Sequence, residues 1–194
     1  MLRLAAGPPC RVAPVNSTLG LTIYPSSRKR GMQTPEPKLR LPPINDYERT
    51  VLSNVDKFGW HCTSVHPRVG DEGESFSYTV GLYRSYGSSE LILFGLPSDT
   101  AHSIFSIFVD RLREGQPISL DTPSEDLIKD YPCVFVPVPR ARYNDYVFSA
   151  LWFYAEVEFP LHQVVYPDRQ GQFPWHPQAT PAFRSQQPLL GQQQ

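Results

Sequence analysis

The sequence predicts an α+β fold: a single domain with a mixed or mostly antiparallel sheet and about three packed helices, behind a disordered leader. Helical periodicity and strand-like alternation follow one another through residues 44–190. A content of 40% hydrophobic and 12% aromatic residues is typical of a globular domain that buries a core. Eight of the 21 prolines lie in the first 43 residues, which show no sustained periodicity, so we expect residues 1–43 to be disordered.

The leader also differs from the rest of the chain in charge. Residues 1–40 carry seven basic side chains and one acidic one, a net charge of +6, whereas the whole chain is −1 and the remainder therefore −7. An Arg-rich, acid-poor start resembles a mitochondrial transit peptide, although its prolines interrupt an amphipathic helix. The alternative is that translation begins at Met32. We expect a cytoplasmic protein, or a mitochondrial one if the leader is translated and acts as a transit peptide.

The first helix is predicted from Asn45 to Phe58. Asn45 is suited to cap the helix, and Glu48 stands three residues later as its capping-box partner. Gly59 offers the left-handed conformation that commonly ends a helix. The apolar residues between these limits recur at helical spacing: Val51, Leu52, Val55 and Phe58.

Three strands are predicted next. Residues 60–66 have strand composition, and residues 76–82 alternate apolar with small or polar side chains, so the two segments are expected to form a hairpin. A loop over residues 83–89 leads to residues 90–96, a nearly continuous apolar run. Such a run is typical of a central strand that is covered on both faces.

The second half of the domain repeats the alternation of helix and strand. A helix that Ser98 caps and Gly115 ends is expected, with one apolar stripe: Ile104, Phe105, Phe108, Val109 and Leu112. A short strand is expected at residues 117–121. Another is expected at residues 133–139, whose prolines put it at a sheet edge or a strand end. A helix within residues 143–154 and a last strand at residues 159–166 complete the domain, and residues 191–194 form a disordered tail.

The stretch YPDRQGQFPWHP, residues 166–177, concentrates more reactive side chains than any other. Asp168 and Gly171 make DRQG a type I turn. Two prolines are expected to hold residues 173–176 extended: Pro174 and Pro177. The turn leaves three side chains unexplained: Arg169, Trp175 and His176.

Five motifs resemble, in their order, a known family. They are FGWH (58–61), SYTVGL (77–82), ELILFGL (90–96), ALWFY (150–154) and HQVVYPDRQGQFPW (162–175). The set is similar to the family catalogued as domain of unknown function 4262, found mostly in bacteria, over about residues 45–190. That family has no established activity, so the resemblance assigns no catalytic residue. It implies that the PD-x-x-G-x-x-PW element belongs to the domain: Pro167, Asp168, Gly171, Pro174 and Trp175.

Composition disfavours several classes of protein. An acidic body with no basic face after residue 40 argues against nucleic-acid binding. No segment approaches the ~20 apolar residues of a membrane span, so we expect a soluble protein that does not bind membranes. Three cysteines make no disulfide framework and indicate a reducing compartment. Cys62 would react only where its pKa is lowered.

Neither a metal nor a cofactor is expected. The five histidines show no spacing of a known metal motif, and His61 and His66 face opposite sides of a regular strand. The alternative is a site from distant segments, built from His61, His162, His176 and Asp168. No glycine-rich phosphate loop and no GxSxG elbow is present, and adjacent His61 and Cys62 cannot form a dyad on a strand.

Two functions are consistent with these observations. The favoured one is a ligand- or partner-binding module. Its aromatic and cationic rim, suited to an anionic small molecule or a peptide carboxylate, would comprise Tyr83, Arg84, Tyr86, Arg169, Trp175 and His176. The alternative is a hydrolase- or transferase-like enzyme in which Asp168 and a histidine, His162 or His176, act as acid and base. The rim forms only if both loops border one face.

Overall fold

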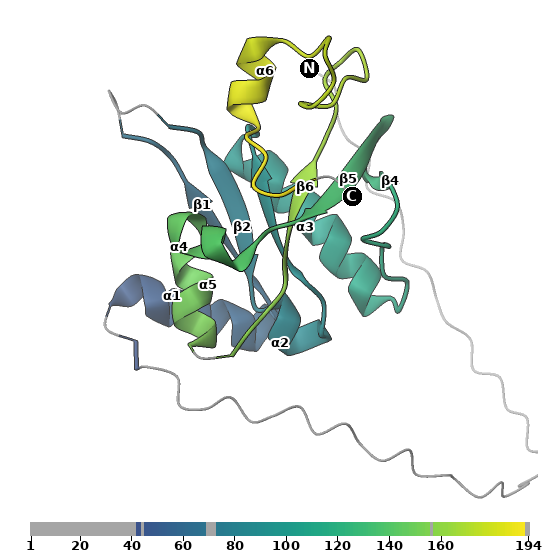
Figure 1. The fold of residues 1–194 in the computed structure, drawn as a ribbon. Coiled ribbons are helices and arrows are strands. Elements are labelled where there is room, and N and C mark those ends of the chain that lie inside the picture. The colour runs from purple at the N-terminus through teal and green to yellow at the C-terminus, as the bar shows by residue number, and fades with distance from the viewer. Residues whose placement is uncertain (1–41, 44, 69–72, 156, 193–194) are drawn as a thin grey trace, which may run out of the picture. The chain divides into compact units, whose positions relative to one another are not determined.

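The structure, a computed structural model, describes residues 42–43, 45–68, 73–155 and 157–192. These residues form an α+β fold with a mixed sheet, as predicted (Figure 1). The leader expected at residues 1–43 lies outside the described residues except for residues 42 and 43. The last two residues of the expected tail, 193–194, also lie outside them.

Six strands form the sheet in the order β1-β2-β3-β6-β5-β4. They are β1 (His61–Val65), β2 (Phe76–Val80), β3 (Glu90–Phe94), β4 (Ser124–Ile128), β5 (Tyr131–Pro137) and β6 (Leu161–Val165). In this sheet β3 and β6 pair in parallel, and the other neighbours pair antiparallel. The carboxyl ends of β3 and β6 therefore meet at one edge of the sheet, below α6 in Figure 1.

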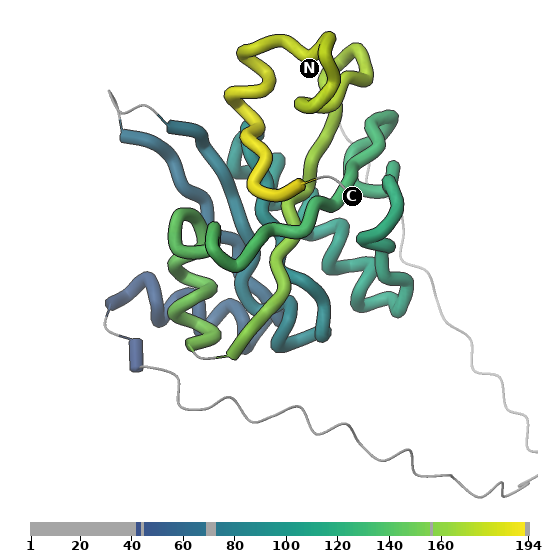
Figure 2. Tube along the Cα trace, in the orientation of Figure 1, coloured from purple at the N-terminus to yellow at the C-terminus, as the bar shows by residue number. Residues whose placement is uncertain are grey.

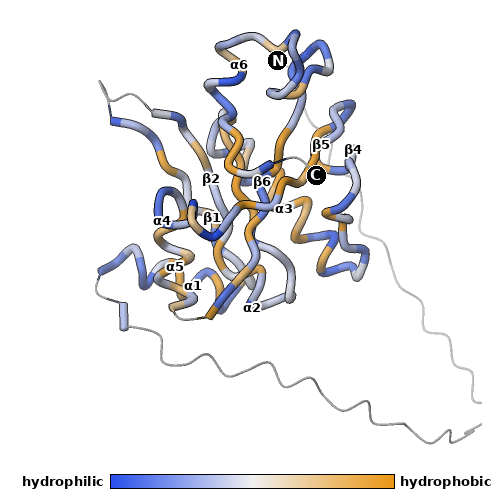
Figure 3. Tube along the Cα trace, viewed as in Figure 1, coloured by the Kyte–Doolittle hydropathy of each residue, from blue (hydrophilic) through white to orange (hydrophobic). Residues whose placement is uncertain are grey.

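Helices cover both faces of the sheet. They are α1 (Asp46–Phe58), α2 (Leu82–Tyr86), α3 (Ser98–Arg113), α4 (Tyr143–Tyr146), α5 (Phe148–Tyr154) and α6 (Pro181–Gln186), with a 3₁₀ turn at Arg140–Arg142. Residues of α1, α4 and α5 pack in one core cluster with Ile92 and Phe94, and residues of α3 pack in the other with Leu91 and Leu93. Strand β3 is thus buried on both faces, as its apolar run predicts, and Figure 3 shows hydrophobic residues gathered in the middle of the sheet.

The limits of α1 confirm the sequence prediction. Asn45 Oδ1 accepts a hydrogen bond of 2.8 Å from the backbone N–H of Glu48, and Gly59 ends the helix at φ 80°. Both signals are local, because each depends only on the conformation of one turn of backbone.

Four elements differ from the predictions. Residues 117–121 are not a strand, and β4 lies instead at Ser124–Ile128. Because β4 occupies the edge of the sheet, β5 is not an edge strand. Of the two positions predicted for its prolines, an edge or a strand end, Pro137 occupies the strand end. The expected loop at 83–89 contains α2, which lies between Gly81 (φ 108°) and Gly87 (φ 66°). The helix expected within 143–154 breaks at Val147 into α4 and α5, and α6 was not predicted. Figure 2 traces this path.

Residues 173–176 are not extended, contrary to the prediction. The backbone N–H of His176 donates to the carbonyl of Phe173 at 2.9 Å, which closes a turn with Pro174 in its second position. The fixed φ of proline suits that position as well as an extended chain, and the hydrogen bond decides between them. The type I turn predicted at DRQG agrees with the bond of 2.9 Å from Gly171 N–H to the carbonyl of Asp168.

Candidate functional site

A cleft of about 710 Å³ opens at the carboxyl ends of β3 and β6. We call it the edge cleft. Its walls come from the β3–α3 segment, the β4–β5 hairpin, the segment after β6, and α6. The lining residues that bear on function are Lys129, Tyr131, Tyr166, Asp168, Arg169 and Phe183. Open sheets with parallel strands commonly bind ligands at this position, and the volume lies within the range of small-molecule sites.

The edge cleft combines apolar residues with two cations, Lys129 and Arg169, and one carboxylate, Asp168. Ile104, Ile107 and Leu127 line the cleft. Ile107 is 40% exposed although it is large and apolar, whereas Ile104 and Leu127 are buried. Lys129 and Arg169 are exposed, and neither makes an ion pair with any described residue. Their charges are therefore available to a ligand.

Tyr166 fixes one wall of the edge cleft. Its hydroxyl donates to the carbonyl of Phe94 at 3.2 Å, and its ring meets Phe183 edge to face at 6.0 Å. Burial raises the pKa of Tyr166 to about 12, so the hydroxyl remains a donor at neutral pH. This side chain ties the end of β6 to the end of β3.

Two fully buried glutamines hold the C-terminal segment against β6. Gln187 accepts from the N–H of Tyr166 at 3.0 Å and donates to the carbonyl of the same residue at 3.0 Å. Gln163 donates to the carbonyl of Pro188 at 2.8 Å and accepts from the N–H of Leu190 at 2.9 Å. We call this set of four hydrogen bonds the glutamine clamp. It positions α6 as a wall of the edge cleft.

Asp168 caps the turn that presents Arg169. Its Oδ1 accepts from the backbone N–H groups of Gln170 at 2.9 Å and of Gln172 at 2.8 Å. Two such bonds close a short loop and hold the following residue, Arg169, at a defined position beside the edge cleft. In this geometry Asp168 is a structural acceptor, and no described histidine forms a hydrogen bond with it.

Trp175 and His176 form a small aromatic cluster with Phe173. The rings of Phe173 and Trp175 stack in parallel at 4.6 Å, and His176 meets both edge to face. His176 Nδ1 accepts from the backbone N–H of Phe173 at 3.2 Å, so that nitrogen takes part in the turn. The cluster follows the turn of Arg169 in the chain, but neither Trp175 nor His176 lines the edge cleft.

His162 lies at the opposite end of β6 from Asp168. Its Nδ1 lies 2.8 Å from the hydroxyl of Ser89, and burial lowers its pKa, an effect that the charge of Asp121 opposes. Because β6 separates the two residues, the acid–base pair considered for Asp168 and His162 is not assembled in this structure.

The predicted rim is also divided between the two ends of the sheet. Tyr83, Arg84 and Tyr86 belong to α2, which packs at the amino end of β3, whereas Arg169 and Trp175 follow the carboxyl end of β6. Figure 1 shows α2 and α6 at opposite ends of the fold. Arg84 pairs with Asp56 at 3.2 Å, and the hydroxyl of Tyr86 accepts from Arg113 at 3.2 Å. The assumption that both loops border one face is therefore wrong.

Sequence reasoning missed four of the lining residues that bear on function: Lys129, Tyr131, Tyr166 and Phe183. Lys129 and Tyr131 lie at the turn of the β4–β5 hairpin, where Asp130 adopts φ 65°. The KD pair between two apolar segments is the signal that could have indicated this turn, since Asp tolerates the left-handed conformation.

Comparison with known protein families agrees with the motif order. The family model described as Domain of unknown function (DUF4262) matches residues 54–180, well over half of the chain. The chain belongs to this family. No curated protein and no solved structure matches it. The matched range contains Arg169, Asp168 and Lys129, so the edge cleft is built largely from the DUF4262 region, and α6 lies just beyond that region.

The DUF4262 region also contains a carboxylate with no exposed surface, Glu90, at the first position of β3. Its Oε1 accepts from the N–H groups of Gly81 at 2.9 Å and Tyr83 at 3.1 Å, and from the hydroxyl of Tyr154. Its Oε2 accepts from the hydroxyl of Thr79 at 2.5 Å. Burial raises the pKa of Glu90 and outweighs these four donors, which favour the charged form. Glu90 therefore joins β2, α2 and α5 at the amino end of β3.

We expect Glu90→Gln to reduce the pH dependence of stability. Because the pKa of Glu90 is raised above its ordinary value of 4.5 by burial, the folded state binds this proton more tightly than the unfolded state. The stabilisation is full below pH 4.5 and is lost as pH rises through the folded-state pKa. Urea unfolding from pH 4 to 8 measures it: the difference in unfolding free energy, variant minus parent, should increase with pH. A constant difference would contradict the raised pKa.

The described residues contain no group of three His, Cys, Asp or Glu side chains placed to hold a metal ion. The two cysteines in this part of the DUF4262 chain are unpaired, and burial raises the pKa of Cys62 to about 11 and that of Cys133 to about 12. Both therefore remain thiols at neutral pH. Among the described helices, none is long and apolar enough to cross a membrane.

Proposed function

We propose that the chain is a binding module whose edge cleft holds a small anion with an apolar body, such as an aromatic carboxylate. The observation that carries this proposal is a pair of cations, Lys129 and Arg169, that have no ion-pair partner among the described residues and line the same cleft as the exposed Ile107. The free carboxylate end of a peptide has the same chemistry. The cytoplasmic location and the lack of nucleic-acid and membrane partners remain predictions.

The expected affinity is modest, with apolar burial as its main source. Burial of apolar surface contributes roughly 25 cal/mol per Å², whereas an exposed charge pair contributes only about 0.2–1 kcal/mol. The two cations should therefore select among ligands of one shape more than they tighten binding. An anionic ligand should bind better than its neutral or cationic counterpart.

A matched set of three compounds tests this selectivity. We would titrate 2-naphthoate, 2-naphthamide and 2-naphthylmethylammonium, which share one apolar body, and follow binding by ligand-observed NMR. The carboxylate should bind most tightly. The double variant Lys129→Gln/Arg169→Gln should weaken carboxylate binding about 2- to 30-fold, since each cation contributes about 0.2–1 kcal/mol, and should leave binding of the amide unchanged.

The matched control removes two positive charges from the opposite end of the sheet. Lys57→Gln/Arg84→Gln lowers the net charge equally, and Arg84 was a member of the predicted rim. It should bind the carboxylate like the parent. If both double variants weakened carboxylate binding equally, the loss would come from the net charge of the protein and not from the edge cleft. Equal binding of all three compounds would reject the proposal.

A further inference from the structure

His66 lies between two serines from different elements. It follows β1, whereas Ser75 precedes β2 and Ser98 is the first residue of α3. Its Nδ1 is 3.2 Å from the hydroxyl oxygen of Ser75, and its Nε2 is 2.9 Å from that of Ser98. Both ring nitrogens are thus hydrogen-bonded, which fixes the plane of the imidazole. We call these three residues the His66 triad.

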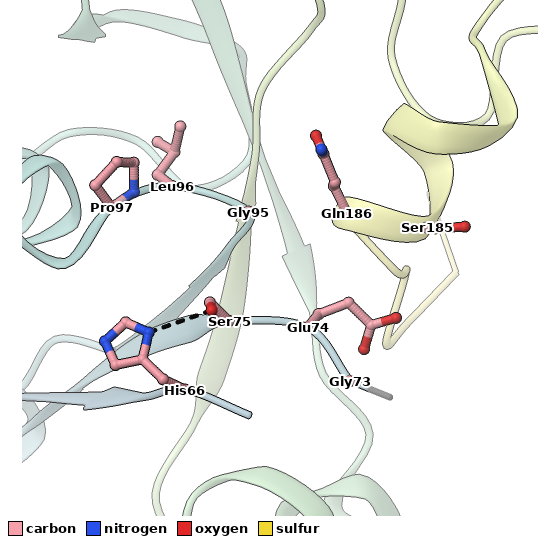
Figure 4. A pocket seen from close by; sticks show the side chains of 9 residues that line it. All are labelled: His66, Gly73, Glu74, Ser75, Gly95, Leu96, Pro97, Ser185 and Gln186. Carbon is pink, nitrogen blue, oxygen red and sulfur yellow. Dashed lines mark hydrogen bonds between the residues drawn. The ribbon is translucent and has the colours of Figure 1, made fainter. Parts of the chain in front are cut away.

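A hollow of about 510 Å³ is lined by His66 and Ser75 of the triad and by Pro97, the residue that precedes Ser98. Figure 4 shows His66 bonded to Ser75 on one side of the hollow, with Leu96 and Pro97 across from them. Glu74 also lines the hollow and adds a negative charge, so an anionic ligand is disfavoured there. The hollow has no Lys or Arg among its lining residues, whereas the edge cleft has two, Lys129 and Arg169, beside the carboxylate of Asp168; the two share Gly95, Leu96 and Gln186.

The His66 triad has the pattern of an activated nucleophile. An imidazole can take the proton of a serine hydroxyl at one nitrogen while an acceptor holds its other N–H in place. With Nδ1–H donating to Ser75, the lone pair of Nε2 faces the hydroxyl of Ser98. The orienting group is a neutral hydroxyl and not a carboxylate, so it stabilises the imidazolium less and turnover should be slow.

The backbone beside Ser98 supplies donors for a developing negative charge. The first backbone hydrogen bond of α3 runs from Ala101 N–H to the carbonyl of Pro97, and no described side chain caps the helix. The N–H groups of the first turn, which begins at Ser98, therefore point out of the helix end. Such N–H groups stabilise the oxyanion of an acyl-transfer reaction.

We propose that Ser98 and His66 hydrolyse small uncharged carboxylic esters. Ser98 Oγ bonds to the ester carbonyl carbon while its proton moves to His66 Nε2. The ester C–O bond then breaks and the alcohol leaves with that proton. Water attacks the acyl-serine, its proton passes through His66 to Ser98 Oγ, and the carboxylic acid leaves. This proposal does not rest on anion binding in the edge cleft.

Hydrolysis of p-nitrophenyl acetate by the full chain, with peptide mapping of the acetylated residue by mass spectrometry, tests the proposal. The parent should release p-nitrophenolate above the buffer rate and carry an acetyl group on Ser98. Ser98→Ala should abolish the acetyl-serine, and His66→Gln should lower the rate about 100-fold, the typical contribution of a general base. Ser75→Ala should lower it less, because Ser75 only positions the imidazole.

A second serine–histidine contact provides matched controls. Ser106 and His102 lie one turn apart in α3, and Ser106 Oγ is 3.4 Å from His102 Nδ1. The Ser106 hydroxyl, however, donates to the backbone carbonyl of His102 at 2.9 Å. Ser106→Ala and His102→Gln should therefore hydrolyse the ester like the parent. A rate that Ser98→Ala does not change, or an acetyl group found only on lysine or histidine, would overturn the proposal. Thermal melts would confirm that each variant is folded.

Discussion

Glu90→Ala should destabilise the fold by at least about 3 kcal/mol, the largest effect we expect from one substitution. Four donors converge on this carboxylate: two backbone N–H groups and the hydroxyls of Thr79 and Tyr154. Alanine removes the acceptor and leaves these donors in a site without exposed surface. Each buried donor that loses its acceptor costs about 1–3 kcal/mol, and the space left by the side chain adds a packing term.

Urea unfolding at pH 7 measures this loss. Glu125→Ala is the matched control, because Glu125 is an exposed carboxylate on β4 and its loss should change the unfolding free energy by less than about 0.5 kcal/mol. Glu90→Gln should retain most of the stability, since its amide keeps an oxygen for the donors around Oε1. A Glu90→Ala variant within 1 kcal/mol of the parent would mean that water or a rearranged side chain replaces the carboxylate.

Gln163→Ala should destabilise the fold by about 2–4 kcal/mol and release the C-terminal segment. The substitution removes the side-chain amide that donates to the carbonyl of Pro188 and accepts from the N–H of Leu190. Leu190 is only 6% exposed. Two buried polar groups without partners account for this range. Because the glutamine clamp holds the segment that follows α6, the wall that contains Phe183 should loosen as well.

Urea unfolding measures the loss of stability, and limited proteolysis measures the release of the C-terminal segment. Gln163→Ala should be cleaved after α6 faster than the parent, and it should bind 2-naphthoate more weakly. Gln178→Ala replaces an exposed glutamine of the preceding loop and should behave like the parent. Unchanged cleavage after α6 in Gln163→Ala would show that the clamp does not restrain the segment.

Glu90 lies at the other end of β3, so Glu90→Gln should leave 2-naphthoate binding intact.

Much of the fold was predictable because its signals are local. The first helix was predicted from a cap at Asn45 and a stop at Gly59, and the turn at DRQG from Asp168 and Gly171. The central strand followed from its apolar run. Each of these features depends on a few adjacent residues, whose backbone preferences remain the same in most folds.

The errors fall where pairing between distant segments decides the structure. Residues 117–121 have strand composition, yet β4 forms later because the hairpin with β5 turns at Lys129 and Asp130. Residues 143–154 have one helical pattern but form two helices that break at Val147. Local preference is too weak to fix such limits when burial against the sheet favours another register.

The candidate sites depended still more on tertiary structure. Arg169 was predicted as a binding residue, but the cation that lines the edge cleft with it is Lys129 and not a residue of α2, since the direction of β3 and β6 decides which loops meet. The contact of His66 with Ser98 spans 32 residues and has no sequence spacing that could predict it. In the sequence Glu90 is only an acidic residue before an apolar run, and nothing there indicates that its carboxylate is buried.

The sequence by itself determined the α+β class, the family, the first helix and the turn that carries Arg169, because periodicity, caps and turn residues act within a few positions. Tertiary structure alone decided which ends of the strands meet, which side chains share a hollow, and which polar groups are buried together. These features arise from packing between segments far apart in the chain, and a buried donor or acceptor finds its partner only when those segments come together.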